Sequence, residues 1–151
     1  MTDTPSPDYA AELNQHLGGW NTAMGLAFTH ASAELVIGEL TIAPHHLQPY
    51  GIVHGGVHTG IIEAACSTGA AVAATRNGQT VVGLENSTSF IKAARGGKLR
   101  VTARPITRGR RTQVWEAIVD DGAGATLATG RVRLICLEPG ADIAGAKAAV
   151  T

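Results

Sequence analysis

One stretch of the chain, from Val57 to Arg76, constrains the fold more than any other. These residues are rich in alanine and nearly free of charge, and Asn77 and Gly78 follow as a C-terminal stop signal. A helix of this length measures about 30 Å, roughly the diameter of a small domain. Because the helix would be apolar on nearly all sides, it must be covered rather than lie on a surface. The sequence therefore predicts one central, buried helix.

Segments rich in β-branched and large apolar residues surround this helix in the sequence. One precedes it, with Gly38 as a candidate bulge, and four follow it, separated by short links that contain glycine or charged residues. Short links favour an antiparallel meander, and one helix against one antiparallel sheet makes a two-layer α+β domain. The predicted strands are 34–42, 80–91, 98–104, 112–120 and 126–137.

Length and composition predict a single domain over residues 1–151. A chain of 151 residues with 44% hydrophobic and 16% charged residues can bury a core. We expect a short helix over 9–17, a core over about 20–138, and a flexible tail rich in alanine and glycine from Pro139 onward.

The charge balance excludes several classes of partner. Twelve basic residues offset twelve acidic ones, which argues against electrostatic capture of nucleic acid or of an acidic membrane.

The N-terminal residues lack the pattern of a secretory signal, and no apolar run is long enough to span a bilayer, so we expect a cytoplasmic protein with no membrane partner. The two cysteines, Cys66 and Cys136, lie in apolar runs and are interpreted as buried thiols rather than as a disulfide framework or a nucleophile.

Glu63 is the one acidic residue within the apolar helix. Burying an unpartnered carboxylate is costly, so this residue is either a hydrogen-bonded structural group at the helix rim or a base or nucleophile in an apolar pocket. Ser67 lies four residues further on, on the same face of the helix, where its hydroxyl could orient the carboxylate or a water molecule.

The start of the helix is a second candidate site. His54 is followed by Gly55 and Gly56, and glycines there allow a ligand to approach the free N–H groups of the first helical turn. Such a position suits a carbonyl oxygen or an anion. The alternative is that the two glycines only shape the turn into the helix.

Taken together, the segment QPYGIVHGG at 48–56, Glu63, Ser67, the segment NSTSFIK at 86–92 and the turn GRRT at 109–112 resemble a known family. They are similar to the hotdog-fold acyl-CoA thioesterases, and most of all to the Arthrobacter-type 4-hydroxybenzoyl-CoA thioesterases and their phenylacetate-pathway relatives. The resemblance spans roughly residues 34–137. It implies a hotdog fold, in which a curved antiparallel sheet wraps a long helix.

The resemblance also implies an activity, hydrolysis of an acyl-CoA thioester with no cofactor beyond the CoA of the substrate. Glu63 matches the catalytic carboxylate and Gly55 the N–H donor to the thioester carbonyl. Gln48 and Ser67 match supporting polar groups, although close relatives have Thr in place of Ser67. His54, at the helix start, is a further catalytic candidate. The residues expected to contact substrate or CoA are Gly56, Thr88, Ser89, Phe90, Lys92, Arg110 and Arg111; at the two arginine positions the closest type has small hydroxyl residues.

The two catalytic roles constrain the assembly once they are accepted. Gly55 and Glu63 are eight positions apart, or about 12 Å along a helix. A donor and an attacking carboxylate that share one carbonyl can be at most about 7 Å apart. We therefore expect a homodimer in which each active site takes Gly55 from one protomer and Glu63 from the other. Two such dimers are expected to form a homotetramer.

Two alternatives stay open at this point, and a third, a metal site, is not favoured. A hotdog hydratase or dehydratase could pair His54 with Glu63, and a non-catalytic protein could bind acyl-CoA without turnover. Histidines at 45, 46, 54 and 58 could hold a metal, but no HExxH pattern and no evident third ligand support this, so we predict no metal site. His54 is expected to cap the helix, and His58 to line the acyl pocket or pack.

Overall fold

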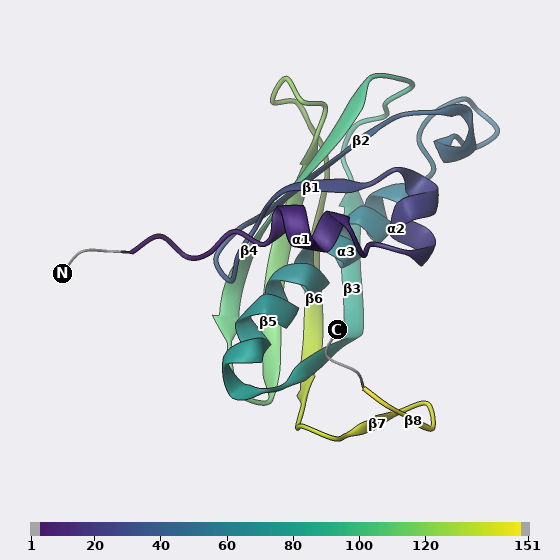
Figure 1. The fold of residues 1–151 in the computed structure, drawn as a ribbon. Helices are drawn as coiled ribbons and strands as arrows, with labels where there is room; N and C mark the ends of the chain where they lie inside the picture. The colour runs from purple at the N-terminus through teal and green to yellow at the C-terminus, as the bar shows by residue number, and fades with distance from the viewer. Residues whose placement is uncertain (1–3, 149–151) are drawn as a thin grey trace.

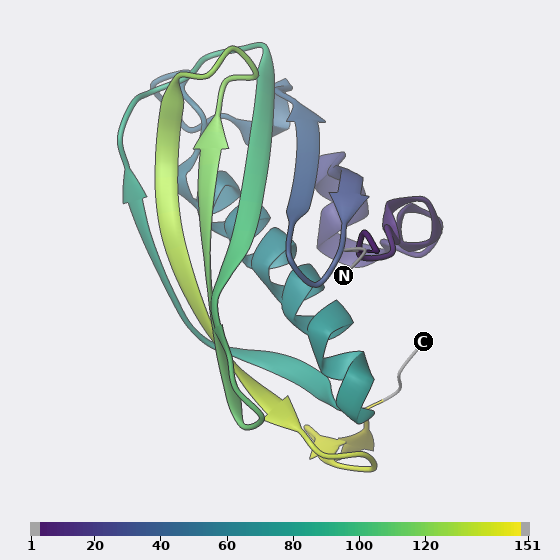
Figure 2. The same ribbon diagram turned by 90° about the vertical axis from the view of Figure 1, so that its left-hand side faces the viewer.

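The computed structural model of the protein describes residues 4–148. A six-stranded antiparallel sheet curves around one long helix, α3 (Gly55–Ala74), which continues into the 3-10 turn η2 (Thr75–Asn77) (Figure 1). Viewed from the side, the helix lies against the concave face of the sheet (Figure 2). This arrangement is the predicted α+β hotdog fold. Among the described residues, no helix is both long and apolar enough to cross a membrane.

The strands follow the order β1-β2-β4-β5-β6-β3 across the sheet. Every predicted strand is present, and the bounds of the last two are as predicted. The structure adds β1, a short edge strand that the sequence pattern did not indicate. The bounds are β1 (Ala27–Ala31), β2 (Val36–Thr41), β3 (Thr80–Phe90), β4 (Lys98–Arg108), β5 (Thr112–Asp120) and β6 (Thr126–Leu137).

The predicted meander is wrong at one position, because β3 pairs with β6 rather than with β4. The segment 91–97 between β3 and β4 is too long for a tight hairpin and crosses the end of the sheet. Backbone hydrogen bonds hold it there, from Val53 N–H to Ala94 O (2.8 Å) and from Ile42 N–H to Gly97 O (2.8 Å). As a result β3 forms one edge of the sheet and runs back alongside α3.

The ends of the chain also differ from expectation. The predicted N-terminal helix is shorter, α1 (Ala10–Asn14). A second helix, α2 (Gly19–Met24), begins at the second of two glycines with positive φ, Gly18 and Gly19. The bulge lies in β1 between Phe28 and His30, opposite Gly38 rather than at it. In the tail, β7 (Asp142–Ile143) and β8 (Ala146–Lys147) form a small hairpin, and residues 149–151 lie outside the described part of the chain.

Small residues in α3 allow two tryptophans to approach its backbone. A Cβ at Gly69 would lie 2.4 Å from the ring of Trp115, which is completely buried under the helix. The indole N–H of Trp115 donates to Gln113 Oε1 (2.9 Å), and Gln113 Nε2 donates to Ala70 O (3.1 Å). Gly60 makes a similar contact with Trp20 of α2, but that ring is 43% exposed.

Replacement of these two glycines by alanine should have different effects on stability. Gly69→Ala forces a methyl group into a buried ring that is fixed by hydrogen bonds, so we expect a loss of about 1–3 kcal/mol in the free energy of unfolding. Gly60→Ala is the matched control, since its neighbour can swing aside and alanine favours a helix by up to about 1 kcal/mol. Urea denaturation of both variants checks this, and equal stability of the two would contradict it.

Candidate active site

The start of α3 presents one free N–H group. His54 is the N-cap, and its Nδ1 accepts a hydrogen bond from the Gly56 N–H (2.8 Å), as expected of a capping residue. The Val57 N–H is bonded to His54 O (2.9 Å). Within residues 4–148 the Gly55 N–H has no acceptor, so it is available to a ligand at the positive end of the helix dipole. The Gly56 N–H, in contrast, is already occupied by the cap.

The loop before the helix places Gln48 beside this N–H. A bridge between Leu47 and Val53 closes the loop, and Gln48 Oε1 accepts a hydrogen bond from the Tyr50 N–H. Gln48 Nε2 has no acceptor in the described part of the chain, so it remains a donor. The loop, the helix start and the end of β3 enclose a hollow of about 350 Å³, lined by Gln48, Ile52, Val53, Gly55, His58, Phe90, Ile91, Lys92 and Ala93. The structure thus brings four of the predicted site residues together: Gln48, Gly55, Phe90 and Lys92.

Glu63 is half-buried on the side of α3 that faces β3, and both of its oxygens are hydrogen-bonded. Oε1 accepts from the Ser67 hydroxyl (3.2 Å), as the spacing suggested, and Oε2 accepts from Asn86 Nδ2 (3.0 Å). Asn86 Nδ2 also donates to Thr59 O (3.1 Å), and its Oδ1 accepts from the Thr88 hydroxyl (2.7 Å). The orientation of the Asn86 amide is therefore set by three partners, and the amide in turn holds the carboxylate.

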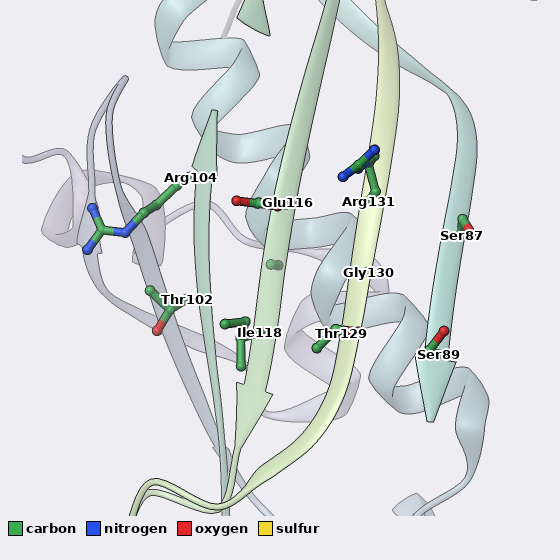
Figure 3. A pocket seen from close by; sticks show the side chains of 10 residues that line it. Ser87, Ser89, Thr102, Arg104, Glu116, Ile118, Thr129, Gly130 and Arg131 are labelled. Carbon is green, nitrogen blue, oxygen red and sulfur yellow. The ribbon is translucent and has the colours of Figure 1, made fainter. Parts of the chain in front are cut away.

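Sequence analysis did not identify Asn86 as a site residue. The available signal was weak: an amide at an inward position of a strand whose neighbours, Ser87 and Ser89, face outward (Figure 3). Thr88, which was predicted to contact substrate, donates its hydroxyl to Asn86 Oδ1.

Gly83 of β3 leaves the space that the Glu63 carboxylate of α3 occupies. A Cβ at position 83 would lie 2.5 Å from Glu63 Oε1, so only a residue without a side chain leaves room for the carboxylate. The pairing of β3 with β6 shifts between Gly83 and Glu85, which marks a bulge at this point. The geometry of β3, rather than that of α3 alone, decides where the carboxylate lies.

Two alternative chemistries gain no support from the site. Burial raises the pKa of the Cys66 thiol far above its usual range, and the negative charge of Glu63 adds to the effect, so Cys66 is not a thiolate nucleophile. His46 is buried with both ring nitrogens engaged, Nδ1 by the Ala43 N–H (2.8 Å) and Nε2 by Met24 O (2.8 Å). Residues 4–148 hold no cluster of three or more His, Cys, Asp or Glu side chains suited to a metal.

Three other residues predicted to contact substrate or CoA lie away from the hollow at the start of α3 within one protomer. Arg110 and Arg111 are in the β4–β5 turn, where Arg110 O accepts from Gln79 Nε2 (3.1 Å) near the C-terminal end of α3. Lys92 lies at the other end, about 30 Å away along the helix. Ser89 lies on the outer face of the sheet, where it lines a separate hollow of about 410 Å³ together with Arg104, Glu116 and Arg131 (Figure 3).

Comparisons with known proteins are consistent with this geometry. Residues 50–128 match the sequence model of the thioesterase superfamily. The chain is 37% identical to Rv1847 of Mycobacterium tuberculosis over 136 residues, 89% of this chain and 96% of that protein. The solved structure of Rv1847 has a TM-score of 0.77, with 79% of this chain and 96% of that chain covered.

Two relatives carry more specific names. The proofreading thioesterase EntH of Klebsiella pneumoniae is 33% identical over 109 residues, which cover 72% of this chain and 79% of that protein. The 1,4-dihydroxy-2-naphthoyl-CoA hydrolase of Escherichia coli is 28% identical over the same shares of the two chains.

Gly83→Ala should displace the Glu63 carboxylate without unfolding the protein. The added methyl group would overlap Oε1, which belongs to the end of a flexible side chain that can rotate away. We expect a crystal structure of the variant to show the bond between Glu63 Oε2 and Asn86 Nδ2 broken, with the sheet unchanged. Gly96→Ala is the control, since a Cβ there meets no atom within 4 Å. An unmoved Glu63 in Gly83→Ala would contradict the role given to Gly83.

Proposed function

The chain belongs to the thioesterase superfamily, and from that premise we propose that it hydrolyses an acyl- or aryl-CoA thioester to the free acid and CoA. That it is a thioester hydrolase follows from the family and from relatives named thioesterase and hydrolase. The observation that carries the more specific proposal is the position of the Glu63 carboxylate. It lies on the helix whose first N–H is free, and its two oxygens accept hydrogen bonds from Ser67 of the same helix and from Asn86 of β3. The E. coli relative, by its name, acts on an aryl-CoA ester.

In the mechanism that we propose, the Gly55 N–H and Gln48 Nε2 donate to the thioester carbonyl oxygen. Their hydrogen bonds strengthen as negative charge develops on that oxygen in the transition state. Glu63 then either attacks the carbonyl carbon, which gives a mixed anhydride that water hydrolyses, or removes a proton from a water molecule that attacks. In both routes the carbon–sulfur bond breaks, CoA leaves as the thiol after protonation, and Ser67 orients the carboxylate or the water.

A second copy of the chain is part of this proposal. One α3 helix places Gly55 and Glu63 about 12 Å apart, which is too far for both to act on one carbonyl. The edge strand β3 supports pairing with another copy. Its outer backbone edge is unpaired within residues 4–148, and Leu84, Phe90 and the adjacent Ile91 are exposed there. A two-fold axis beside β3 would set two α3 helices antiparallel and bring the start of one toward the middle of the other. Association of two dimers into a tetramer stays a prediction of the resemblance.

The same antiparallel arrangement supports a divided CoA site. The C-terminal end of one α3, near Arg110 and Arg111, would then lie toward the N-terminal end of the other, near Lys92. We propose that these basic residues, taken from two protomers, contact the CoA phosphates. Arg110 is exposed and only loosely paired with Glu138 (3.6 Å), so it is free to exchange that partner for a phosphate.

A panel of alkyl- and aryl-CoA esters tests the function directly. Release of free CoA thiol supports the thioesterase, addition of water to an enoyl-CoA would support a hydratase, and tight binding without turnover would support a binding protein. Because His54 Nδ1 accepts a hydrogen bond from the Gly56 N–H, a hydratase that paired His54 with Glu63 would have to use His54 Nε2. A folded Glu63→Gln variant with full turnover would contradict both proposed routes.

The role of the Gly55 N–H can be isolated with two substitutions at one position. Gly55→Pro removes the N–H at the first helical position, where proline is tolerated, and His54 already has the extended conformation that precedes a proline. Gly55→Ala adds the same Cβ, which meets the exposed Phe90 ring, but keeps the N–H. We expect kcat to fall by about 10²–10³ in the proline variant and far less in the alanine variant. Equal losses in both would contradict donation by this N–H.

Mixing two inactive variants tests the shared site. In a heterodimer of Gly55→Pro and Glu63→Gln protomers, one site carries both substitutions and the other carries neither. Random exchange of subunits should therefore restore about a quarter of the wild-type activity. Activity measured before and after a cycle of unfolding and refolding of the mixture checks this. Restoration would not occur if both groups of a site came from the same protomer.

A further inference from the structure

A buried histidine, His46, lies at the base of the loop that leads into α3. Its side chain is only 1% exposed, and both ring nitrogens are hydrogen-bonded to the backbone. Nδ1 accepts from the Ala43 N–H (2.8 Å), which closes the short 3-10 turn η1 (Pro44–His46). Nε2 is 2.8 Å from Met24 O, at the last residue of α2. The ring therefore joins the loop to a separate element of the fold.

The backbone partners of His46 fix the tautomer of its ring. A backbone N–H can only donate, so the Nδ1 that faces the Ala43 N–H carries no proton. A carbonyl oxygen can only accept, so the Nε2 that faces Met24 O carries one. Met24 O belongs to the last turn of α2, where carbonyls lack acceptor bonds within the helix. The neutral Nε2–H form satisfies both backbone groups, and loss of the ring would leave both without it.

His46 also forms the base of the hairpin that presents the proposed donors to the thioester. We call residues 46–54 the donor hairpin. His46 O accepts from the His54 N–H (2.8 Å) at the base, and the Gln48 N–H donates to Ile52 O (2.8 Å) nearer the tip. Gln48 lies two residues after His46 on the first arm, and Gly55 follows directly after His54 on the second. The position of the base therefore affects where both donors point.

The two arms of the donor hairpin are attached to the fold at different places. The Val53 N–H of the second arm donates to Ala94 O (2.8 Å), and Arg95 Nη1 donates to Tyr50 O at the tip (2.7 Å). Among the described residues, the bond from His46 Nε2 is the only hydrogen bond that links residues 43–48 to a part of the chain outside the loop. Without this bond the first arm would lose its attachment while the second kept its own.

We propose that His46 is a positioning residue for the hydrolysis, which acts through Gln48 and the helix start rather than by contact with the substrate. This inference rests on the proposed function and adds to it a residue that does not line the hollow at the start of α3. Donors to a developing oxyanion must lie about 2.7–3.1 Å from the oxygen, and a misplacement of about 1 Å can cost about 10²-fold in rate. The bond to Met24 O gives the first arm that precision.

Two substitutions of His46 separate its two ring nitrogens. In His46→Asn the amide oxygen lies near the place of Nδ1 and can accept from the Ala43 N–H, but the bond to Met24 O is lost. In His46→Gln the amide nitrogen reaches the region of Nε2 and can keep the bond to Met24 O. For the ester that the wild type hydrolyses fastest, we expect kcat to fall about ten-fold or more in His46→Asn, with KM within about three-fold of wild type. His46→Gln should retain most of kcat.

His45→Asn is the matched control for these variants. The neighbouring His45 is exposed, and its ring stacks on that of His46 with 4.0 Å between centroids but has no hydrogen bond within residues 4–148. We expect wild-type kcat and KM in this variant. Circular dichroism of every variant at the assay temperature shows that the compared proteins are folded.

A double-mutant cycle shows whether His46 acts through Gln48. Gln48→Ala removes the donor on the first arm, so His46→Asn should lower kcat by a smaller factor in that background than in the wild type. Equal factors in the two backgrounds would overturn the proposal. Wild-type kcat in a folded His46→Asn variant, a loss confined to KM, or equal losses in the Asn and Gln variants would also overturn it, and each would leave the thioesterase standing. Absence of hydrolysis of any ester by the wild type would overturn the proposed function itself.

A measurement on the wild-type protein keeps the inference testable if His46→Asn does not fold. ¹⁵N NMR of the imidazole reports which ring nitrogen carries the proton, and it needs no turnover. We expect the Nε2–H tautomer of His46 near pH 7. A proton on Nδ1 would show that the ring does not donate to Met24 O and would overturn the attachment on which the proposal depends.

Discussion

The burial of α3 in the concave face of the sheet is the contact on which the rest of the molecule depends. The helix has almost no charge and buries residues on most of its circumference, so its removal from water dominates the packing of the core. Every group of the candidate site is placed relative to this helix. The free N–H lies at its first residue, Glu63 lies at its middle, and the strand that receives Glu63 runs back along its side (Figure 1).

Close packing of the helix depends on residues that have no side chain. Gly69 admits the buried ring of Trp115, and Gly60 admits Trp20. Gly83 does the same on β3, but there the group admitted is a carboxylate. The absence of a side chain therefore allows close packing in the core and sets the position of the Glu63 carboxylate at the candidate site. A half-buried carboxylate with one hydrogen bond on each oxygen is held in position while it can still meet a substrate.

The parts of the fold that sequence analysis predicted are those with a strong local signal. The strand over 112–120 has alternating burial, and the central helix has an apolar run and a stop signal, so both were found with nearly correct bounds. The short strand β1 and the helix α2 have no such pattern. The pairing of β3 with β6 joins residues about fifty positions apart, and nothing in either strand alone distinguishes β6 from β4 as a neighbour.

The sequence by itself determined that a buried helix carries one acidic residue and begins with two glycines, because burial and charge within one helix depend on neighbours a few positions away. Only the tertiary structure decided what holds that acid and what surrounds the helix start. Asn86 reaches Glu63 from 23 residues further along, and His58 faces a hollow whose other walls come from a loop and from the end of β3. Such contacts depend on how the chain crosses from β3 to β4. That path is set by the packing of the whole sheet against α3 rather than by any local pattern.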